Sequence, residues 1–194
     1  MIPIERLTGR MGNKMFQYAY LYAQMREGVI PNIYVQDEKY FEKCADEIKE
    51  LFGHGIGFLP YIGIHVRRAA NPINPDEPKY SENPFYVNLS ETDYYERAIE
   101  LFPGKQFLIF SDDTEWCKEK WGKNDRFQVM EGQTELEDFN MLASCSSIIM
   151  ANSSFSWWAS YLCPNPSKHI VAPKNWYADG NETRTVIPNT WTKI

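Results

Sequence analysis

The sequence lacks the features of membrane-spanning, disulfide-stabilised and secreted proteins. No apolar run approaches the roughly 20 residues that cross a bilayer, and the opening MIPIERLTG has neither the basic nor the apolar region of a signal peptide. The four cysteines form no Cys-x-x-Cys pair and no metal-site spacing with the three histidines. We therefore expect a cytoplasmic protein with reduced cysteines, no membrane span and no metal site built from cysteine and histidine.

Positive charge is also scarce. Twenty Lys and Arg residues stand against 26 Asp and Glu residues, for a formal net charge of −6. This balance argues against a general nucleic-acid-binding surface, because such surfaces depend on clustered basic residues. An anionic ligand would need a local positive site.

The 194 residues, 43% of them hydrophobic, are enough for one domain or two small lobes. Hydrophobic spacing predicts a short strand and glycine turn over 4–12 and a long proline-containing loop over 69–89. Helices are predicted at 13–28, 38–53, 92–102, 114–122, 135–145 and 154–162, and strands at 61–68, 105–113, 126–130, 146–151 and within 168–180. This alternation predicts an α/β fold with a parallel sheet and ligands at the carboxyl ends of its strands.

Three polar motifs stand at the carboxyl ends of predicted strands: HVRR, Asp112-Asp113 and Asn152-Ser153-Ser154. In HVRR, His65 and Arg67 share one face of the strand while Arg68 points to the other, and a guanidinium suits phosphate binding. The strand at 146–151 leads through Asn152, Ser153 and Ser154 into a helix. Such a helix N-terminus favours an anion, although the same residues also serve as ordinary helix caps.

The acidic residues and glycines leave alternatives open. Asp112 and Asp113 suit a divalent metal, a ligand or the cap of the next helix. A carboxylate at Asp138, next to Glu137, suits the N–H edge of a guanine or a solvated helix face. Gly9 and Gly12 bracket a turn where backbone approaches a ligand closely, but their spacing is a weak signal.

Four segments together resemble the alpha-1,2-fucosyltransferases of glycosyltransferase family 11, within the wider fucosyltransferase superfamily. They are TGRMGNKMFQYAY, HVRRAA, FSDDTEWC and ELEDFNMLASCSSIIMANSSFSWWASYL. The resemblance implies a GT-B-like pair of Rossmann-type lobes: a reduced N-terminal acceptor lobe over 1–60, and a GDP-sugar-binding lobe with the parallel sheet over 61–194. It also implies inverting transfer of fucose from GDP-fucose to a glycan hydroxyl, by an alpha-1,2 linkage to a galactoside, without a cofactor.

The resemblance also assigns roles to residues. Arg67 would bind the β-phosphate with His65 beside it, and Asn13 would face the reacting sugar. Asp138 would recognise guanine, and Asp112 and Asp113 would organise the nucleotide pocket. The other expected substrate-binding residues lie in the glycine turn, after the strands and at the diphosphate: Gly9, Gly12, Arg68, Asn152, Ser153, Ser154 and Phe155.

The chain departs from the family pattern at several positions. Ala69 and Ala70 stand where the family has Gly-Asp, Lys14 replaces a Gln, and Arg10 replaces a Gly. The general base stays open between His65, Glu5 and no strong base. Two other functions therefore remain: a GDP-sugar-binding module without turnover, and a metal-dependent enzyme that uses Asp112 and Asp113. Assembly as a homo-oligomer also stays open.

Overall fold

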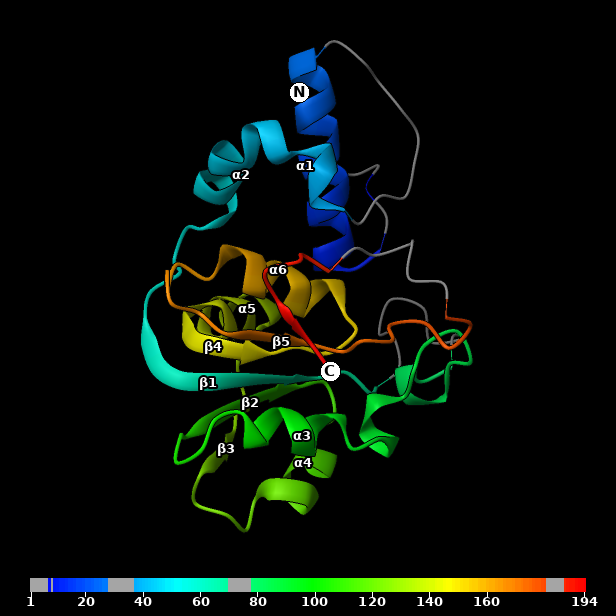
Figure 1. Ribbon diagram of the computed structural model, residues 1–194, viewed down its shortest axis with the longest axis vertical. Coiled ribbons are helices and arrows are strands. Elements are labelled where there is room, and N and C mark those ends of the chain that lie inside the picture. The colour runs from blue at the N-terminus through cyan, green and yellow to red at the C-terminus, as the bar shows by residue number, and fades with distance from the viewer. Residues whose placement is uncertain (1–6, 8, 28–36, 70–77, 181–186) are drawn as a thin grey trace.

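A parallel six-stranded sheet forms the centre of the protein (Figure 1). The computed structural model describes residues 7, 9–27, 37–69, 78–180 and 187–194. The strands are β1 (Leu59–Val66), β2 (Phe107–Ser111), β3 (Phe127–Val129), β4 (Cys145–Ile149), β5 (Ile170–Ala172) and β6 (Thr192–Lys193). The expected α/β class with a parallel sheet is confirmed, and β6 is an additional strand.

The strand order, β3-β2-β1-β4-β5-β6, is that of a Rossmann fold. The order reverses between β1 and β4, which pair directly, with Ile64 opposite Ile149. In such sheets the crevice at the carboxyl ends of the two strands at the reversal is the usual ligand site. The HVRR segment ends β1 and the Asn152–Ser154 segment follows β4, so the topology brings these two motifs to that crevice.

Helices cover both faces of the sheet. On one face α3 (Tyr94–Glu100) and α4 (Thr114–Trp121) pack on Ile62, Ile64 and other apolar side chains. On the other lie α5 (Glu135–Ser144) and α6 (Ser154–Leu162), with α1 (Met11–Glu27) and α2 (Ala45–Phe52) stacked beyond α6 (Figure 1). Side chains alternate along β1 as predicted, so His65 faces α6 while Ile64 and Val66 face α3.

The N-terminal helices share a hydrophobic core with α6. Trp157 and Trp158 are fully buried, and both ring systems contact Phe16 of α1, with centroids 4.6 and 4.9 Å apart. Phe41 stacks on Trp158 at 5.4 Å. This core fixes the start of α1 against the start of α6. The expected division into lobes at residue 60 stays a prediction.

Several predicted elements differ in detail. The helix expected over 38–53 is two 3₁₀ turns, Glu38–Tyr40 and Glu42–Cys44, followed by α2. Residues 1–6 and 8 of the expected first strand lie outside the described residues, and 9–12 turn into α1. Of the predicted loop over 69–89, the described part contains the 3₁₀ turn Tyr80–Glu82, and a second 3₁₀ turn, Leu89–Glu91, begins at its last residue. None of the helices in the described residues is long and apolar enough to cross a membrane.

Candidate active site

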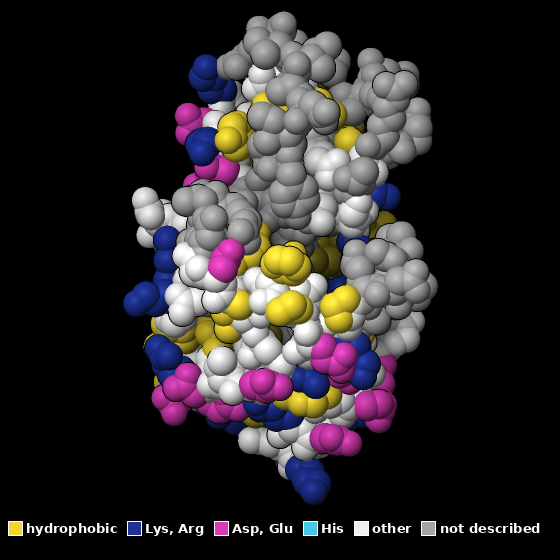
Figure 2. All heavy atoms as spheres, turned by 90° about the vertical axis from the view of Figure 1, so that its right-hand side faces the viewer, with side chains coloured by type: hydrophobic (Ala, Val, Ile, Leu, Met, Phe, Trp, Pro, Cys, Tyr) yellow, Lys and Arg dark blue, Asp and Glu magenta, His cyan; other side chains and the backbone are white. Residues whose placement is uncertain are grey.

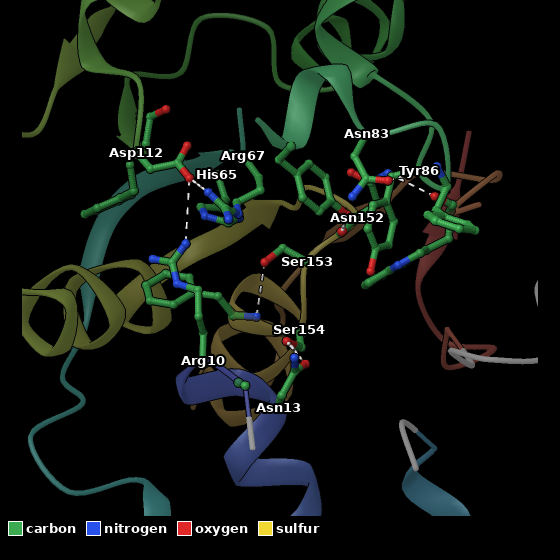
Figure 3. A pocket seen from close by; sticks show the side chains of 18 of the residues that line it. Arg10, Asn13, His65, Arg67, Asn83, Tyr86, Asp112, Asn152, Ser153 and Ser154 are labelled. Carbon is green, nitrogen blue, oxygen red and sulfur yellow. Dashed lines mark hydrogen bonds and ion pairs between the residues drawn. The ribbon is translucent and has the colours of Figure 1, made fainter. Parts of the chain in front are cut away.

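A cleft of about 980 Å³ opens at the carboxyl ends of β1, β2 and β4 (Figure 3). It lies at the reversal of strand order, where α1 and α6 also begin. Eleven of the thirteen predicted site residues line it: Gly9, Gly12, Asn13, His65, Arg67, Asp112, Asp138, Asn152, Ser153, Ser154 and Phe155. Segments far apart in the sequence therefore meet in one cavity.

Two helix N-termini meet at the floor of this cleft. A Cβ on Gly12 would lie 2.5 Å from the carbonyl carbon of Ser154, so only a glycine permits this approach of α1 to α6. The Ser154 hydroxyl donates to Asn13 Oδ1 at 2.7 Å and links the two helices. Ser153 caps α6, its hydroxyl accepting from the Phe155 N–H at 3.3 Å. The two helix dipoles together favour an anion here.

Arg67 supplies positive charge beside these N-termini (Figure 3). Its side chain is only 10% exposed, forms an ion pair with Asp112, and donates to the Ala69 carbonyl at 3.0 Å. Burial, with a contribution from the nearby positive charge of Arg10, lowers the pKa of Arg67 to about 10, so the guanidinium stays charged at neutral pH.

Arg10 is a second cation of the cleft, which the sequence marked only as a departure from the family glycine. Its guanidinium lies 3.8 Å from Asp112 and 3.6 Å from Glu135 at the start of α5. Asp112 also accepts the backbone N–H groups of Arg68 and Ala69, at 2.8 and 3.1 Å. Asp112 therefore organises the loop after β1 and both arginines.

His65 is buried and stacks on Phe155, with ring centroids 5.0 Å apart. Burial, followed by the charges of Arg67 and Arg10, lowers the pKa of His65 to about 3. The imidazole is therefore neutral at physiological pH and only a weak base. Its Nδ1 is a buried polar atom without a hydrogen-bond partner in the described part of the chain.

The two neighbouring acids at the start of α5 have separate roles. Glu137 completes a capping box with Thr134, and these hydrogen bonds lower the pKa of its carboxyl group. Asp138 lines the cleft, and its Oδ1 is buried without a hydrogen-bond partner among the described residues. Burial, with a smaller contribution from Glu137, raises the pKa of Asp138 to about 6. A ligand N–H group would satisfy this acceptor.

Arg68 and Asp113 do not line the cleft. Arg68 donates to Asp113 Oδ2 at 3.0 Å and to the Ser90 hydroxyl, and its guanidinium lies 4.4 Å from the Trp116 ring centroid. Asp113 caps α4 by accepting from the Trp116 N–H at 3.2 Å. Their expected ligand roles thus gain no support from the geometry. No group of three or more potential metal ligands occurs within the described ranges.

Aromatic side chains also line the cleft, and we call Tyr80, Phe85, Tyr86 and Tyr177 the aromatic wall. Tyr86 lies on the side of the cleft away from Asp112 (Figure 3). Asn152 supports it, because its amide nitrogen donates to the Val87 and Trp176 carbonyls at 2.9 and 3.0 Å. The Tyr80 hydroxyl donates to the Asn152 carbonyl. Asn152 thus positions the wall. No local sequence pattern predicted the wall; the proline-containing loop over 69–89 was the one signal near Tyr80, Phe85 and Tyr86.

The cleft lies toward a face of mixed character. Figure 2 shows apolar side chains gathered near the middle of this face, with acidic and basic side chains interspersed below them. Phe85 of the aromatic wall is 66% exposed, the largest exposed fraction of the described large hydrophobic residues. Among the described residues that line the cleft, positive charge is confined to Arg10 and Arg67, which stand beside the carboxylates of Asp112, Glu135 and Asp138.

Comparisons with known proteins identify relatives of this chain among glycosyltransferases. The chain is 30% identical over 139 residues to an O-antigen biosynthesis glycosyltransferase, WbnK, of Escherichia coli, covering 68% of this chain and 43% of that protein. It is 28% identical over 181 residues to an alpha-1,2-colitosyltransferase of Escherichia coli, covering 82% and 60%. A bovine galactoside 2-alpha-L-fucosyltransferase, SEC1, is 24% identical over 190 residues, covering 94% and 48%.

The chain thus spans about half the length of the curated relatives it matches. The match to a family model runs from the start of α1 through both strand ends at the cleft and the helix that follows β4. This model, glycosyl transferase family 11, matches residues 11–194, and the chain belongs to that family.

Proposed function

We propose that this chain is an inverting glycosyltransferase that moves fucose from GDP-fucose to a glycan hydroxyl, forming an alpha-1,2 linkage to a galactoside. One observation carries the proposal: Arg67 and the N-termini of α1 and α6 converge in one cleft at the strand-order reversal. Membership of glycosyl transferase family 11 supports glycosyl transfer, and the name of the bovine relative supports fucose and the linkage.

The charges of the cleft suit a nucleoside diphosphate. In the transfer, the bond between the anomeric carbon and the β-phosphate oxygen breaks through an oxocarbenium-like state, while the acceptor oxygen attacks from the opposite face. Negative charge then grows on the departing GDP. Arg67 and the N–H groups at the start of α6 stabilise it without reorganising, which is usually the largest catalytic contribution.

The nucleobase fits beside Asp138. Guanine presents two adjacent N–H donors, and the unpartnered Asp138 Oδ1 is a buried acceptor at the cleft. Asp112 pairs with both Arg10 and Arg67, and it holds the loop after β1 in place by accepting two of its backbone N–H groups. The diphosphate would displace Asp112 from part of its contact with Arg67.

Proton removal from the acceptor needs no strong base in this scheme. With a pKa of about 3, His65 is too weak a base to take the proton early in the reaction. The other candidate, Glu5, lies outside the described residues. We propose that the acceptor hydroxyl loses its proton late, to solvent, after the bond to GDP has broken. His65 then serves as a neutral positioning residue beside the diphosphate.

The test is a transfer assay with purified protein, GDP-fucose and β-galactoside acceptors, with and without EDTA. Acceptor-dependent GDP release and a product one fucose heavier, both unaffected by EDTA, are the expected results. GDP-fucose binding without turnover would instead indicate the binding-module alternative, and EDTA-sensitive turnover would indicate the metal-dependent one. A donor carrying colitose belongs in the same panel, because one relative is named a colitosyltransferase.

A further inference from the structure

We propose that the aromatic wall is the acceptor subsite and that it binds the galactopyranose ring of a β-galactoside. The inference rests on the proposed function, which says that the reaction is a transfer to a galactoside. Its structural basis is separate, however, because it depends on residues outside the diphosphate site: Tyr80, Phe85, Tyr86, Tyr177 and the neighbouring Asn83.

The position of the wall along the cleft is the first argument. Figure 3 shows Asp112 on one side, Arg67, Ser153 and Ser154 in the middle, and Asn83 and Tyr86 on the other side. Arg10 contacts both Asp112 and Glu135 of the first turn of α5, so Asp138 belongs to the Asp112 side. With guanine there and the diphosphate in the middle, the transferred sugar and its acceptor are left for the wall.

The wall also begins directly at the reaction centre. The guanidinium of Arg67 lies 5.1 Å from the centroid of the Tyr80 ring, and Tyr80 stacks on Tyr86 at 4.5 Å. Tyr86 in turn lies 5.6 Å from Tyr177. A sugar ring against the wall is therefore adjacent to the group that binds the leaving diphosphate.

Backbone pairing makes the wall a fixed surface. The Val87 N–H donates to the Trp176 carbonyl at 3.3 Å, and the Ala178 N–H donates to the Phe85 carbonyl at 3.0 Å. The buried Asn152 amide joins the same two segments. A surface that is already ordered loses little conformational entropy when it binds a ligand.

The chemistry of the wall suits galactose. The axial O4 of galactose leaves one ring face lined by C–H groups, which pack against an aromatic ring, while the hydroxyls at the ring edge need hydrogen-bond partners. Phe85 offers a 66% exposed ring at the cleft. Asn83 Oδ1 accepts from the Phe85 backbone N–H at 3.0 Å, which holds the Asn83 amide beside the backbone of the residue that carries this ring. The apolar Phe85 ring suits the C–H face of the sugar, and the nearby amide suits the hydroxyls at its edge.

The test measures lactose binding to the GDP-saturated protein by NMR titration. Phe85→Ala is expected to weaken lactose binding about threefold to tenfold, which lies within the range of one aromatic contact. Phe85→Trp should restore it, and GDP affinity should not change. Phe58→Ala is the matched control, because Phe58 is 63% exposed but does not line the cleft. Lactose affinity within about twofold of wild type in Phe85→Ala, or no lactose binding by the wild type, overturns the proposal.

A parallel fucose-transfer assay separates the two proposals. If lactose binding depends on Phe85 but no fucose is transferred, the proposed function fails while the sugar subsite stands. If fucose is transferred to lactose and Phe85→Ala leaves the KM for lactose unchanged, the function stands and the wall assignment fails. If both hold, Phe85→Ala should raise the KM for lactose with little change in kcat or in the KM for GDP-fucose.

Discussion

Gly12→Ala tests whether the contact between α1 and α6 builds the diphosphate site. The added methyl group would lie 2.5 Å from the Ser154 carbonyl carbon, 2.6 Å from the Phe155 nitrogen and 2.7 Å from the Ser154 oxygen, whereas ordinary contacts are 3.4–4 Å. All three atoms are backbone, so no side-chain rotation relieves the clash. The two helix starts must separate by about 1 Å.

The expected losses of stability and of activity follow from this displacement. Overpacking of this kind costs about 1–3 kcal/mol, which for a domain of this size lowers Tm by roughly 2–12 °C. A shift of about 1 Å in a positioning element lowers a reaction rate by up to about a hundredfold. We therefore expect kcat/KM for fucose transfer to fall by one to two orders of magnitude, with a weaker affinity for GDP.

Gly57→Ala is the matched control. A Cβ there would meet only the Ser144 hydroxyl, at 3.9 Å, and the residue does not have a positive φ. It should keep wild-type GDP affinity, measured by calorimetry, and wild-type transfer kinetics. The reasoning is refuted if Gly12→Ala binds GDP and transfers fucose as well as Gly57→Ala does while remaining folded.

Three further predictions concern pH and stability. The pKa of Asp138 is raised to about 6, and only the ionised carboxylate accepts both guanine N–H groups, so GDP affinity should rise from pH 5 to pH 7 and level off above. Asp138→Asn should bind GDP weakly and with a shallower slope in a titration across pH, the remaining slope coming from the terminal phosphate of GDP, whose pKa is also about 6. The pKa of His65 is about 3 in the folded protein and about 6.5 in the unfolded chain, so between these values only the unfolded chain binds the proton. The free energy of unfolding, measured with urea, should therefore be largest above pH 6.5 and fall toward pH 3. His65→Phe should lessen that fall. Phe16→Ala removes a fully packed ring between α1 and the two tryptophans, so it should lower the free energy of unfolding by about 3–5 kcal/mol; a loss below about 1 kcal/mol would mean that α1 is not part of the core.

The sequence was informative where local pattern determines structure. The apolar run before Asn152 and the caps at Ser153 and Asp113 are local signals, and the structure has a strand and two helix starts there. The alternation of side chains along β1 correctly predicted that His65 and its neighbours in the strand lie on opposite faces of the sheet. The alternation of elements was also sufficient to predict the parallel sheet and the edge at which the motifs meet.

Other features depend on contacts between distant residues. Arg10 and Arg67 share Asp112 only because the turn before α1 comes to the end of β2, and nothing local indicates that. The aromatic wall joins residues 80–86 to Tyr177 through backbone pairing across a long separation. The family resemblance assigns Arg68 and Asp113 to the site, yet they pair with each other outside the cleft.

The most direct test of the account is the rate of fucose transfer by Arg67→Ala. Arg97→Ala is the control, because Arg97 is an exposed arginine whose ion pair is on the surface of α3. If Arg67 stabilises the departing GDP, its removal should lower kcat/KM on the order of a thousandfold, equivalent to about 4 kcal/mol of barrier, while Arg97→Ala stays at the wild-type rate. Turnover by Arg67→Ala within about tenfold of the control would contradict the assignment of the diphosphate site.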